Sequence, residues 1–226
     1  MSRFDAFAFD AYGTLFDVYS ISALAERLVP GQGLALTQLW RTKQLEYSWL
    51  SSLMISATYP RPDFDAVTRQ ALDYALAALV IPLDRAAREK LIGAYLELDA
   101  FADAAATLER LAPTPRVILS NGTQAMLRPL LEHSGLASQL DDIVSVDDAG
   151  IFKPSPRVYQ LLVDRFNTPA QRIAFVSSNG WDAAGAKAFG FTTFWINRAG
   201  LPMERHAPDP DFVIGSLAQI PELAKS

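Results

Sequence analysis

Short apolar runs and long helical patterns alternate along the chain in a way that indicates its fold. Runs without alternating polar residues are typical of strands covered on both faces. We predict such strands at Ala6–Phe9, Val117–Leu119, Ile143–Ser145, Ile173–Val176, Thr193–Ile196 and Phe212–Ile214. Helical spacing predicts helices at Asp103–Leu111, Gln124–Ser134, Ser155–Phe166 and Trp181–Phe189. This alternation predicts an α/β fold, a parallel sheet with helices on both faces.

The stretch between the first two predicted strands is helical instead. Apolar residues recur near helical spacing in three segments, which begin at Leu36, Phe64 and Asp84. The predicted stripes are Leu36, Leu39, Trp40, Leu45, Trp49 and Leu53 in the first segment, and Val67, Ala71, Tyr74, Ala75 and Ala78 in the second. Asp84 is a candidate N-cap of the third helix. We therefore predict a helical cap, residues 16–98, inserted into a core of residues 1–15 and 99–226.

Composition excludes several classes of function. The 226 residues carry a net charge of −5, which argues against a nucleic-acid surface and against attraction to anionic lipids. The absence of cysteine excludes a disulfide framework, a zinc–thiolate site and a cysteine nucleophile. We find no signal peptide and no apolar run near the roughly 20 residues of a membrane helix. A cytoplasmic protein with neither a nucleic-acid nor a membrane partner is expected.

Polar residues stand where the predicted strands end. They are Asp10, Tyr12 and Thr14 after the first strand, Ser120 and Asn121 after the second, Lys153 after the third, and Ser177, Asn179 and Asp182 after the fourth. Ligands of open α/β sheets bind beyond the carboxyl ends of the strands. Several polar ends that converge predict a site, in preference to a set of solvated loop ends.

Four of these segments resemble a known family. "FDAYGTLFDV", "LSNGT", "KPSPRVY" and "FVSSNGWDAAGAKAFGF" are similar to the haloacid dehalogenase superfamily, and more narrowly to the L-2-haloacid dehalogenases. The segments occur in the family's order, and the similarity extends to the predicted cap helix "LWRTKQLEYSWLSSLM". The resemblance implies a Rossmann-like, doubly wound core with an inserted helical cap.

The resemblance implies that Asp10 is the nucleophile. A carboxylate is ionised at neutral pH and needs no base to activate it. Most members of the superfamily are phosphatases with a second aspartate two positions later, which protonates the departing alkoxide. This chain has Tyr12 there, and a halide leaves without a proton. The missing acid therefore favours carbon–halogen cleavage. The alternative is that Asp10 only caps a turn with Gly13 and Thr14.

The chain also lacks the acids with which the phosphatases bind magnesium. After the fourth strand it has Ser177, Ser178 and Asn179, and only Asp182 is acidic. His133 and His206 lie in unrelated places. We expect no metal and no other cofactor. Lys153 would instead supply positive charge beside Asp10, although by itself it would be interpreted as a solvated loop lysine.

The implied mechanism has two steps. Asp10 attacks C2 of a 2-haloalkanoic acid with inversion, and water then attacks the carboxyl carbon of the aspartyl ester. Asp182 is the first choice to position or deprotonate this water, with Ser177, Asn179 and Lys153 around it. Asp182 has an alternative role as an N-cap of the following helix. Thr14 and Tyr159 are expected to orient the group by hydrogen bonds.

Two anion-binding elements are implied as well. The substrate carboxylate would meet Ser120 and backbone N–H groups near Ala11, Tyr12 and Asn121. The halide would meet Asn121, the Trp181 ring and Arg41, whose forked charge suits both anions; by itself Arg41 would be an ordinary surface arginine. The expected apolar wall contains Leu45, Tyr12, and Tyr59 or Phe64. For Trp40 and Trp49 we prefer helix packing.

The expected partners are a small halogenated carboxylic acid as substrate, a halide ion as product, and a second copy of the chain in a homodimer. The homodimer comes from the resemblance alone. One alternative is a small-molecule phosphatase of the same superfamily, which would depend on magnesium. A second is a catalytically silent fold used as a binding protein, in which Asp10 and Lys153 would be dispensable.

Overall fold

The computed structural model describes residues 3–205 and 207–225, which form two compact units. The first contains the described residues up to Asp17, Ala100–Asn121, and those from Gly135 onward. The second contains Val18–Asp99 and Gly122–Ser134. It thus includes residues 122–134, which the division expected from the sequence assigned to the core. That division remains a prediction.

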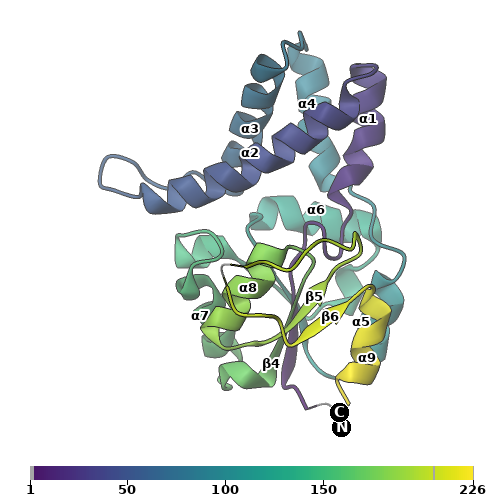
Figure 1. Ribbon diagram of the computed structural model, residues 1–226, viewed down its shortest axis with the longest axis vertical. Helices are drawn as coiled ribbons and strands as arrows, with labels where there is room; N and C mark the ends of the chain where they lie inside the picture. Colours follow the sequence, from purple (N-terminus) through teal and green to yellow (C-terminus); the bar gives the residue numbers. More distant parts are fainter. Residues whose placement is uncertain (1–2, 206, 226) are drawn as a thin grey trace. The chain divides into compact units, whose positions relative to one another are not determined.

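The first unit is built on a six-stranded sheet in the order β3-β2-β1-β4-β5-β6, and every neighbouring pair is parallel (Figure 1). The strands are β1 (Ala6–Phe9), β2 (Arg116–Ser120), β3 (Asp142–Ser145), β4 (Ile173–Ser177), β5 (Thr192–Ile196) and β6 (Phe212–Ile214). The predicted α/β class and parallel sheet are confirmed. This is the doubly wound order, in which the order of the strands reverses between β1 and β4. Ligands of such sheets bind at this switch point, beyond the carboxyl ends of the strands.

Helices cover this sheet. They are α5 (Ala104–Leu111), α7 (Pro156–Phe166), α8 (Gly180–Phe189) and the short α9 (Ile220–Leu223). Helices α7 and α8 pack against each other, and α5 packs against α9 on the other side of the sheet in Figure 1. Strands β1 and β4 are buried along their whole length. The residues that follow them are therefore anchored by the most buried part of the sheet.

The second unit is helical. It contains α1 (Ile21–Leu28), α2 (Gly33–Leu53), α3 (Phe64–Ala78), α4 (Arg85–Gly93) and α6 (Gln124–Ser134). Asp84 is the predicted N-cap of α4, and its carboxylate accepts the Ala87 N–H at 2.7 Å. Helix α1 was not predicted. Among the described residues, no helix has the length and apolarity needed to cross a membrane.

Three positions of the predicted stripes are wrong. Leu53 is 83% exposed because it is the last residue of α2, and Tyr74 and Ala78 of α3 are exposed as well. Helix α3 buries Leu72 and Leu76 instead. Its packing face against α2 is therefore rotated from the face that the spacing suggested.

Candidate active site

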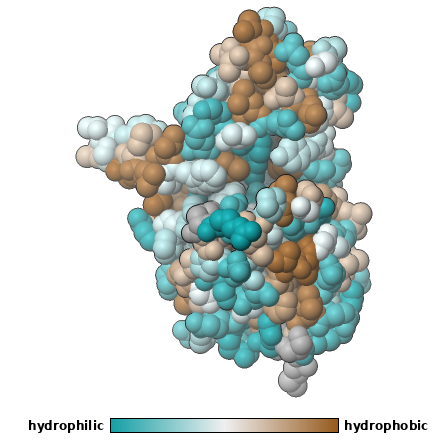
Figure 2. Space-filling model, in the orientation of Figure 1, coloured by the Kyte–Doolittle hydropathy of each residue, from teal (hydrophilic) through white to brown (hydrophobic). Residues whose placement is uncertain are grey.

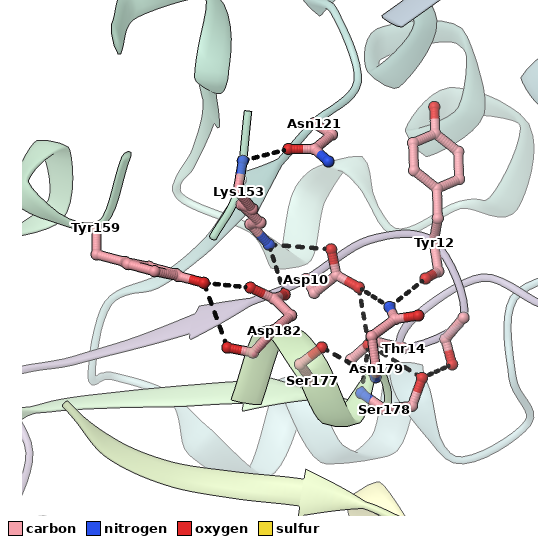
Figure 3. Close-up of polar contacts among 11 residues, drawn as sticks. Asp10, Tyr12, Thr14, Asn121, Lys153, Tyr159, Ser177, Ser178, Asn179 and Asp182 are labelled. Carbon is pink, nitrogen blue, oxygen red and sulfur yellow. Dashed lines mark hydrogen bonds and ion pairs between the residues drawn. The ribbon is translucent and has the colours of Figure 1, made fainter. Parts of the chain in front are cut away.

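Asp10 follows the buried strand β1 and is itself only 6% exposed. Its backbone N–H donates to the Val176 carbonyl at 2.9 Å, which fixes it beside the end of β4. One carboxylate oxygen, Oδ2, accepts hydrogen bonds from Asn179 Nδ2 at 2.8 Å and from Thr14 Oγ1 at 3.2 Å (Figure 3). The other, Oδ1, lies 3.1 Å from Lys153 Nζ. Asp10 is therefore no simple turn cap, because side chains from two distant segments hold its carboxylate.

Lys153 bridges two carboxylates. Its ammonium lies 3.1 Å from Asp10 and 2.8 Å from Asp182, and its side chain is 1% exposed. Burial lowers the pKa of Lys153, but the two carboxylates outweigh burial and raise that pKa above 10.5. The ammonium therefore stays charged at neutral pH. The interpretation as a solvated loop lysine is wrong.

Asp182 lies in the first turn of α8 and is fully buried. Tyr159 donates its hydroxyl to Oδ1 at 2.8 Å, while Oδ2 faces Lys153. Burial raises the pKa of Asp182 to about 6, and the charge of Asp10 adds to this, against the opposing effect of Lys153. The N-cap residue of α8 is Asn179, so Asp182 does not have that alternative role. Asp182 can thus accept a proton near neutral pH.

The loop after β1 is tied to the loop after β4. Thr14 Oγ1 accepts the Ser178 N–H at 2.8 Å, and Ser178 Oγ donates to the Gly13 carbonyl. Asn179 also donates to the Tyr12 carbonyl at 3.1 Å. Gly13 has a φ of +89°, and an added Cβ would lie 3.2 Å from Ser178 Oγ. Ser178 could not be identified from the sequence, because a serine beside a strand end has no distinctive pattern.

The amide of Asn121 has a fixed orientation. Its Oδ1 accepts the backbone N–H of Lys153 at 3.0 Å, and its Nδ2 points away from that contact (Figure 3). The Nδ2 group is therefore presented as a donor. Ser120, at the end of β2, is fully buried, as is Ser177, whose Oγ accepts the Asn179 N–H at 3.1 Å.

Close packing holds Tyr159 against α8. A Cβ on Gly185 would lie 2.8 Å from the Tyr159 hydroxyl and 2.6 Å from Pro154 Cβ. Only glycine therefore allows this approach of Tyr159 and the Lys153–Pro154 segment. Gly185 was not predicted as a site residue, and its one signal in the sequence is the run of small residues "AAGAKA".

The remaining candidates divide between the two units. Ala11 and Tyr12 are buried and Trp181 is half-buried in the first unit. In the second unit α2 holds Arg41, which is buried, and Leu45, which is half-buried. Trp40 donates its indole N–H to the Thr68 carbonyl at 2.8 Å, which confirms its predicted packing role. Phe64 is buried in the same unit, Trp49 is half-buried and Tyr59 is exposed.

No group of three or more His, Cys, Asp or Glu side chains suited to a metal occurs in residues 3–205 and 207–225. His206 lies outside the described residues, so the prediction about it has no structural counterpart. The expectation of a metal-free site stays a prediction.

A doubly wound parallel sheet with a buried carboxylate at its switch point defines the class of an α/β protein whose ligand site lies beyond the carboxyl ends of the strands. Residues 4–190 match the haloacid dehalogenase-like hydrolase family, so the chain belongs to that family. It is 41% identical to the (S)-2-haloacid dehalogenase of Xanthobacter autotrophicus, over 97% of this chain and 94% of the relative. The corresponding enzyme of Pseudomonas putida is 40% identical, over 97% and 96%.

Solved structures of L-2-haloacid dehalogenases are similar to this chain over nearly its full length. The L-2-haloacid dehalogenase from Xanthobacter autotrophicus has a TM-score of 0.91 and 40% identity, and the alignment covers 98% of both chains. The same enzyme with chloropropionic acid covalently bound also has a TM-score of 0.91, with 39% identity and 99% of both chains covered.

Proposed function

We propose that this protein is an (S)-2-haloacid dehalogenase. It hydrolyses short L-2-haloalkanoic acids to D-2-hydroxy acids with inversion, through an ester on Asp10. The observation that carries the proposal is the buried carboxylate of Asp10, which shares the Lys153 ammonium with Asp182 and has Tyr12, not an acid, two residues later. The full-length similarity to (S)-2-haloacid dehalogenases supports the same reaction.

In the first step a carboxylate oxygen of Asp10 attacks C2 of the substrate. The new C–O bond forms as the carbon–halogen bond breaks, and the halide leaves with the bonding electron pair. The hydrogen bonds from Thr14 and Asn179 and the ion pair with Lys153 fix the attacking group before substrate arrives. Such fixed orientation removes much of the entropy cost of the reaction. No proton is needed for the leaving group, which agrees with Tyr12.

In the second step water attacks the carboxyl carbon of the ester, whose acyl C–O bond breaks. Asp182 accepts one proton of this water as its oxygen bonds to the carboxyl carbon. When the acyl C–O bond breaks, the departing alkoxide takes the other water proton and leaves as the D-2-hydroxy acid. The Asp10 carboxylate is thereby regenerated, and Asp182 then releases its proton to solvent. The raised pKa of Asp182, about 6, suits a general base at neutral pH. Tyr159 and Lys153 position its two oxygens, and Ser177 and Asn179 flank the site.

Substrate recognition follows from the donors at the strand ends. Ser120 and the backbone N–H groups of Ala11 and Tyr12 bind the substrate carboxylate in this proposal. Asn121 offers its Nδ2 to the halide because Lys153 occupies its oxygen. We assign Arg41 and the Trp181 ring to the halide as well, and Leu45 and Tyr12 to the apolar wall.

We also propose a homodimer, a cytoplasmic location and activity without a metal. Support for the dimer comes from a row of exposed apolar side chains on the last turns of α2 and the loop after it, namely Leu50, Leu53, Met54, Ile55 and Tyr59. Figure 2 shows some apolar surface on α2 and the loop after it, beside paler surface of intermediate hydropathy. Isolated hydrophobic residues are ordinary on a surface, but a contiguous group is typical of an interface. The molar mass from light scattering tests the dimer. We expect the wild type to be dimeric and Leu53→Lys to be monomeric, and a monomeric wild type would contradict the proposal.

The experiment measures halide release from L- and D-2-chloropropionate with EDTA present. We expect release from the L-isomer alone, with D-lactate as product. Asp10→Asn should abolish turnover and stay folded, while Asp148→Asn, at an exposed acid, serves as the matched control. Magnesium-dependent hydrolysis of phosphate esters without halide release would establish the phosphatase alternative. If the protein shows neither halide release nor phosphatase activity, the remaining alternative is a catalytically silent binding protein.

A further inference from the structure

A buried hydrogen-bonded chain connects Arg41 to the neighbouring helix in the second unit. Arg41 Nη1 donates to Gln44 Oε1 at 2.7 Å, and Gln44 Nε2 donates to Thr68 Oγ1 at 2.6 Å. Thr68 Oγ1 donates in turn to the Phe64 carbonyl at 2.6 Å. Gln44 and Thr68 are both fully buried, and α2 packs along α3 (Figure 1). The proposed function gives Gln44 and Thr68 no role.

The chain has only one consistent direction. The single hydroxyl hydrogen of Thr68 is used on the Phe64 carbonyl, so Thr68 can only accept from Gln44. Gln44 must therefore turn its NH₂ toward Thr68 and its carbonyl oxygen toward Arg41. Flipping the amide would turn its NH₂ toward the Arg41 donor and its oxygen toward the Thr68 oxygen, and the buried Tyr95 hydroxyl, now 3.5 Å from Oε1, would lose its acceptor. Such mismatched buried groups are costly. Thr68 thus fixes the face of Gln44 that Arg41 meets.

We infer that Gln44, oriented by Thr68, is the positioning residue of Arg41. A guanidinium has five N–H donors, and Gln44 engages one of them without neutralising the positive charge. A carboxylate at position 44 would hold the same donor but would cancel the charge that an anionic substrate and a halide require. This inference rests on the proposed role of Arg41 in binding these anions.

The test compares kcat and KM for L-2-chloropropionate in matched variants. Gln44→Met should lower kcat/KM about ten- to hundredfold, because it removes the acceptor and keeps the volume. Gln38→Met changes an exposed glutamine of the same helix and should stay within about twofold of wild type. Gln44→Glu should raise KM more than it lowers kcat, since it acts on the charge. An effect of Gln44→Met no larger than that of Gln38→Met overturns the inference.

Coupling to Arg41 separates positioning from a structural role. In an Arg41→Lys background, Gln44→Met should cost less than about threefold, because the group it positions is already gone. An equal loss in both backgrounds, or full activity of Arg41→Lys, overturns the inference. If Gln44→Met does not fold, Thr68→Val tests the same chain: it should reduce activity, and Thr68→Ser should restore it. The inference is also overturned if the activity does not depend on the hydroxyl, that is, if Thr68→Val stays fully active or Thr68→Ser is as impaired as Thr68→Val.

A measurement without turnover keeps this inference distinct from the proposed function. The Arg41 Nε–H should be ordered in wild type by ¹⁵N relaxation and become mobile in Gln44→Met, with Gln38→Met unchanged. An equally ordered Arg41 in all three proteins overturns the positioning role. Inactivity of the wild type toward 2-haloacids would overturn the proposed function, and this measurement would still decide the positioning role.

Discussion

The two acids of the site should be coupled through their charges, so that neutralising Asp10 lowers the pKa of Asp182. Both carboxylates bind the same ammonium, at 3.1 Å and 2.8 Å. The charge of Asp10 is one cause of the raised pKa of Asp182, after burial. The ester of the first step removes this charge, and so does Asp10→Asn. Asp182 should therefore ionise more readily in both.

The size of the effect follows from Coulomb's law. Two unit charges about 5 to 6 Å apart, at an effective dielectric constant of about 20, interact by roughly 3 kcal/mol, or about two pKa units. The pKa of Asp182, about 6 in the free enzyme, should thus fall toward its ordinary value of 3.8 when Asp10 is neutral. Because burial still raises the pKa of Asp182, this pKa should not fall further. Hydrolysis of the ester should consequently continue at pH values where Asp182 of the free enzyme is already protonated.

Carboxyl ¹³C NMR titration of wild type and Asp10→Asn measures the shift directly, with Asp148→Asn as control. A single-turnover experiment follows ester decay between about pH 4 and 8, and its acid limb should lie below about 6. A pKa of Asp182 that stays near 6 or rises in Asp10→Asn would refute the coupling. An acid limb of ester decay above about pH 6, or ester decay that also persists in Asp182→Asn, would refute the role of Asp182 as base.

The raised pKa also makes a prediction for stability. Because the folded-state pKa of Asp182 lies above 3.8, the folded protein binds this proton more tightly than the unfolded chain. The stability contributed by that proton is fully present below about pH 4 and is lost as the pH rises through about 6. The loss is roughly 3 kcal/mol for about two pKa units. The difference in unfolding free energy between wild type and Asp182→Asn should show it, and a flat difference over this range would contradict it.

Two further substitutions test the packing. Gly185→Ala should lower kcat at least tenfold, because its Cβ would displace the Tyr159 hydroxyl. Gly93→Ala serves as the control and should leave kcat unchanged, since the space around Gly93 is open. Equal kinetics of the two variants would contradict this packing role of Gly185. Val80→Gly should raise the free energy of unfolding by about 1 kcal/mol, as measured by urea titration. Val80 is 84% exposed and has a φ of 55°, a backbone conformation that favours glycine. A lower free energy of unfolding in the variant would contradict this prediction.

The fold could be predicted wherever burial dominates the sequence pattern. Strand β1 and strand β6 begin and end where the apolar runs do, and α6 spans the predicted residues. Helix α1 was missed because it is only eight residues long and buries only Ile21 and Ala25, although its apolar and polar residues lie on opposite faces. The face of α3 was misjudged because alanine-rich sequences carry little contrast between faces.

The site was predictable to the extent that its residues end strands. Asp10, Lys153 and Asp182 could be brought together in this way, because parallel strands converge at one edge. Gln44 and Gly185 could not. A buried glutamine has the same sequence pattern as one on a solvated helix face, and a contact that only glycine permits depends on the packing of segments far apart in sequence.

Charge balance connects these residues to the proposed reaction. With all groups ionised, Asp10, Asp182 and Lys153 carry a net charge of −1, yet the substrate is itself an anion. Binding the substrate beside this group requires donors that no acid neutralises. The proposed anion-binding groups fit this requirement, because the amide of Asn121 is neutral and Arg41 has the neutral Gln44, not an acid, as its hydrogen-bond acceptor. Esterification brings the group to net zero as a halide anion is produced. In the proposed function the positive charge of Arg41 then binds the halide, and an acid at position 44 would weaken the binding of both anions.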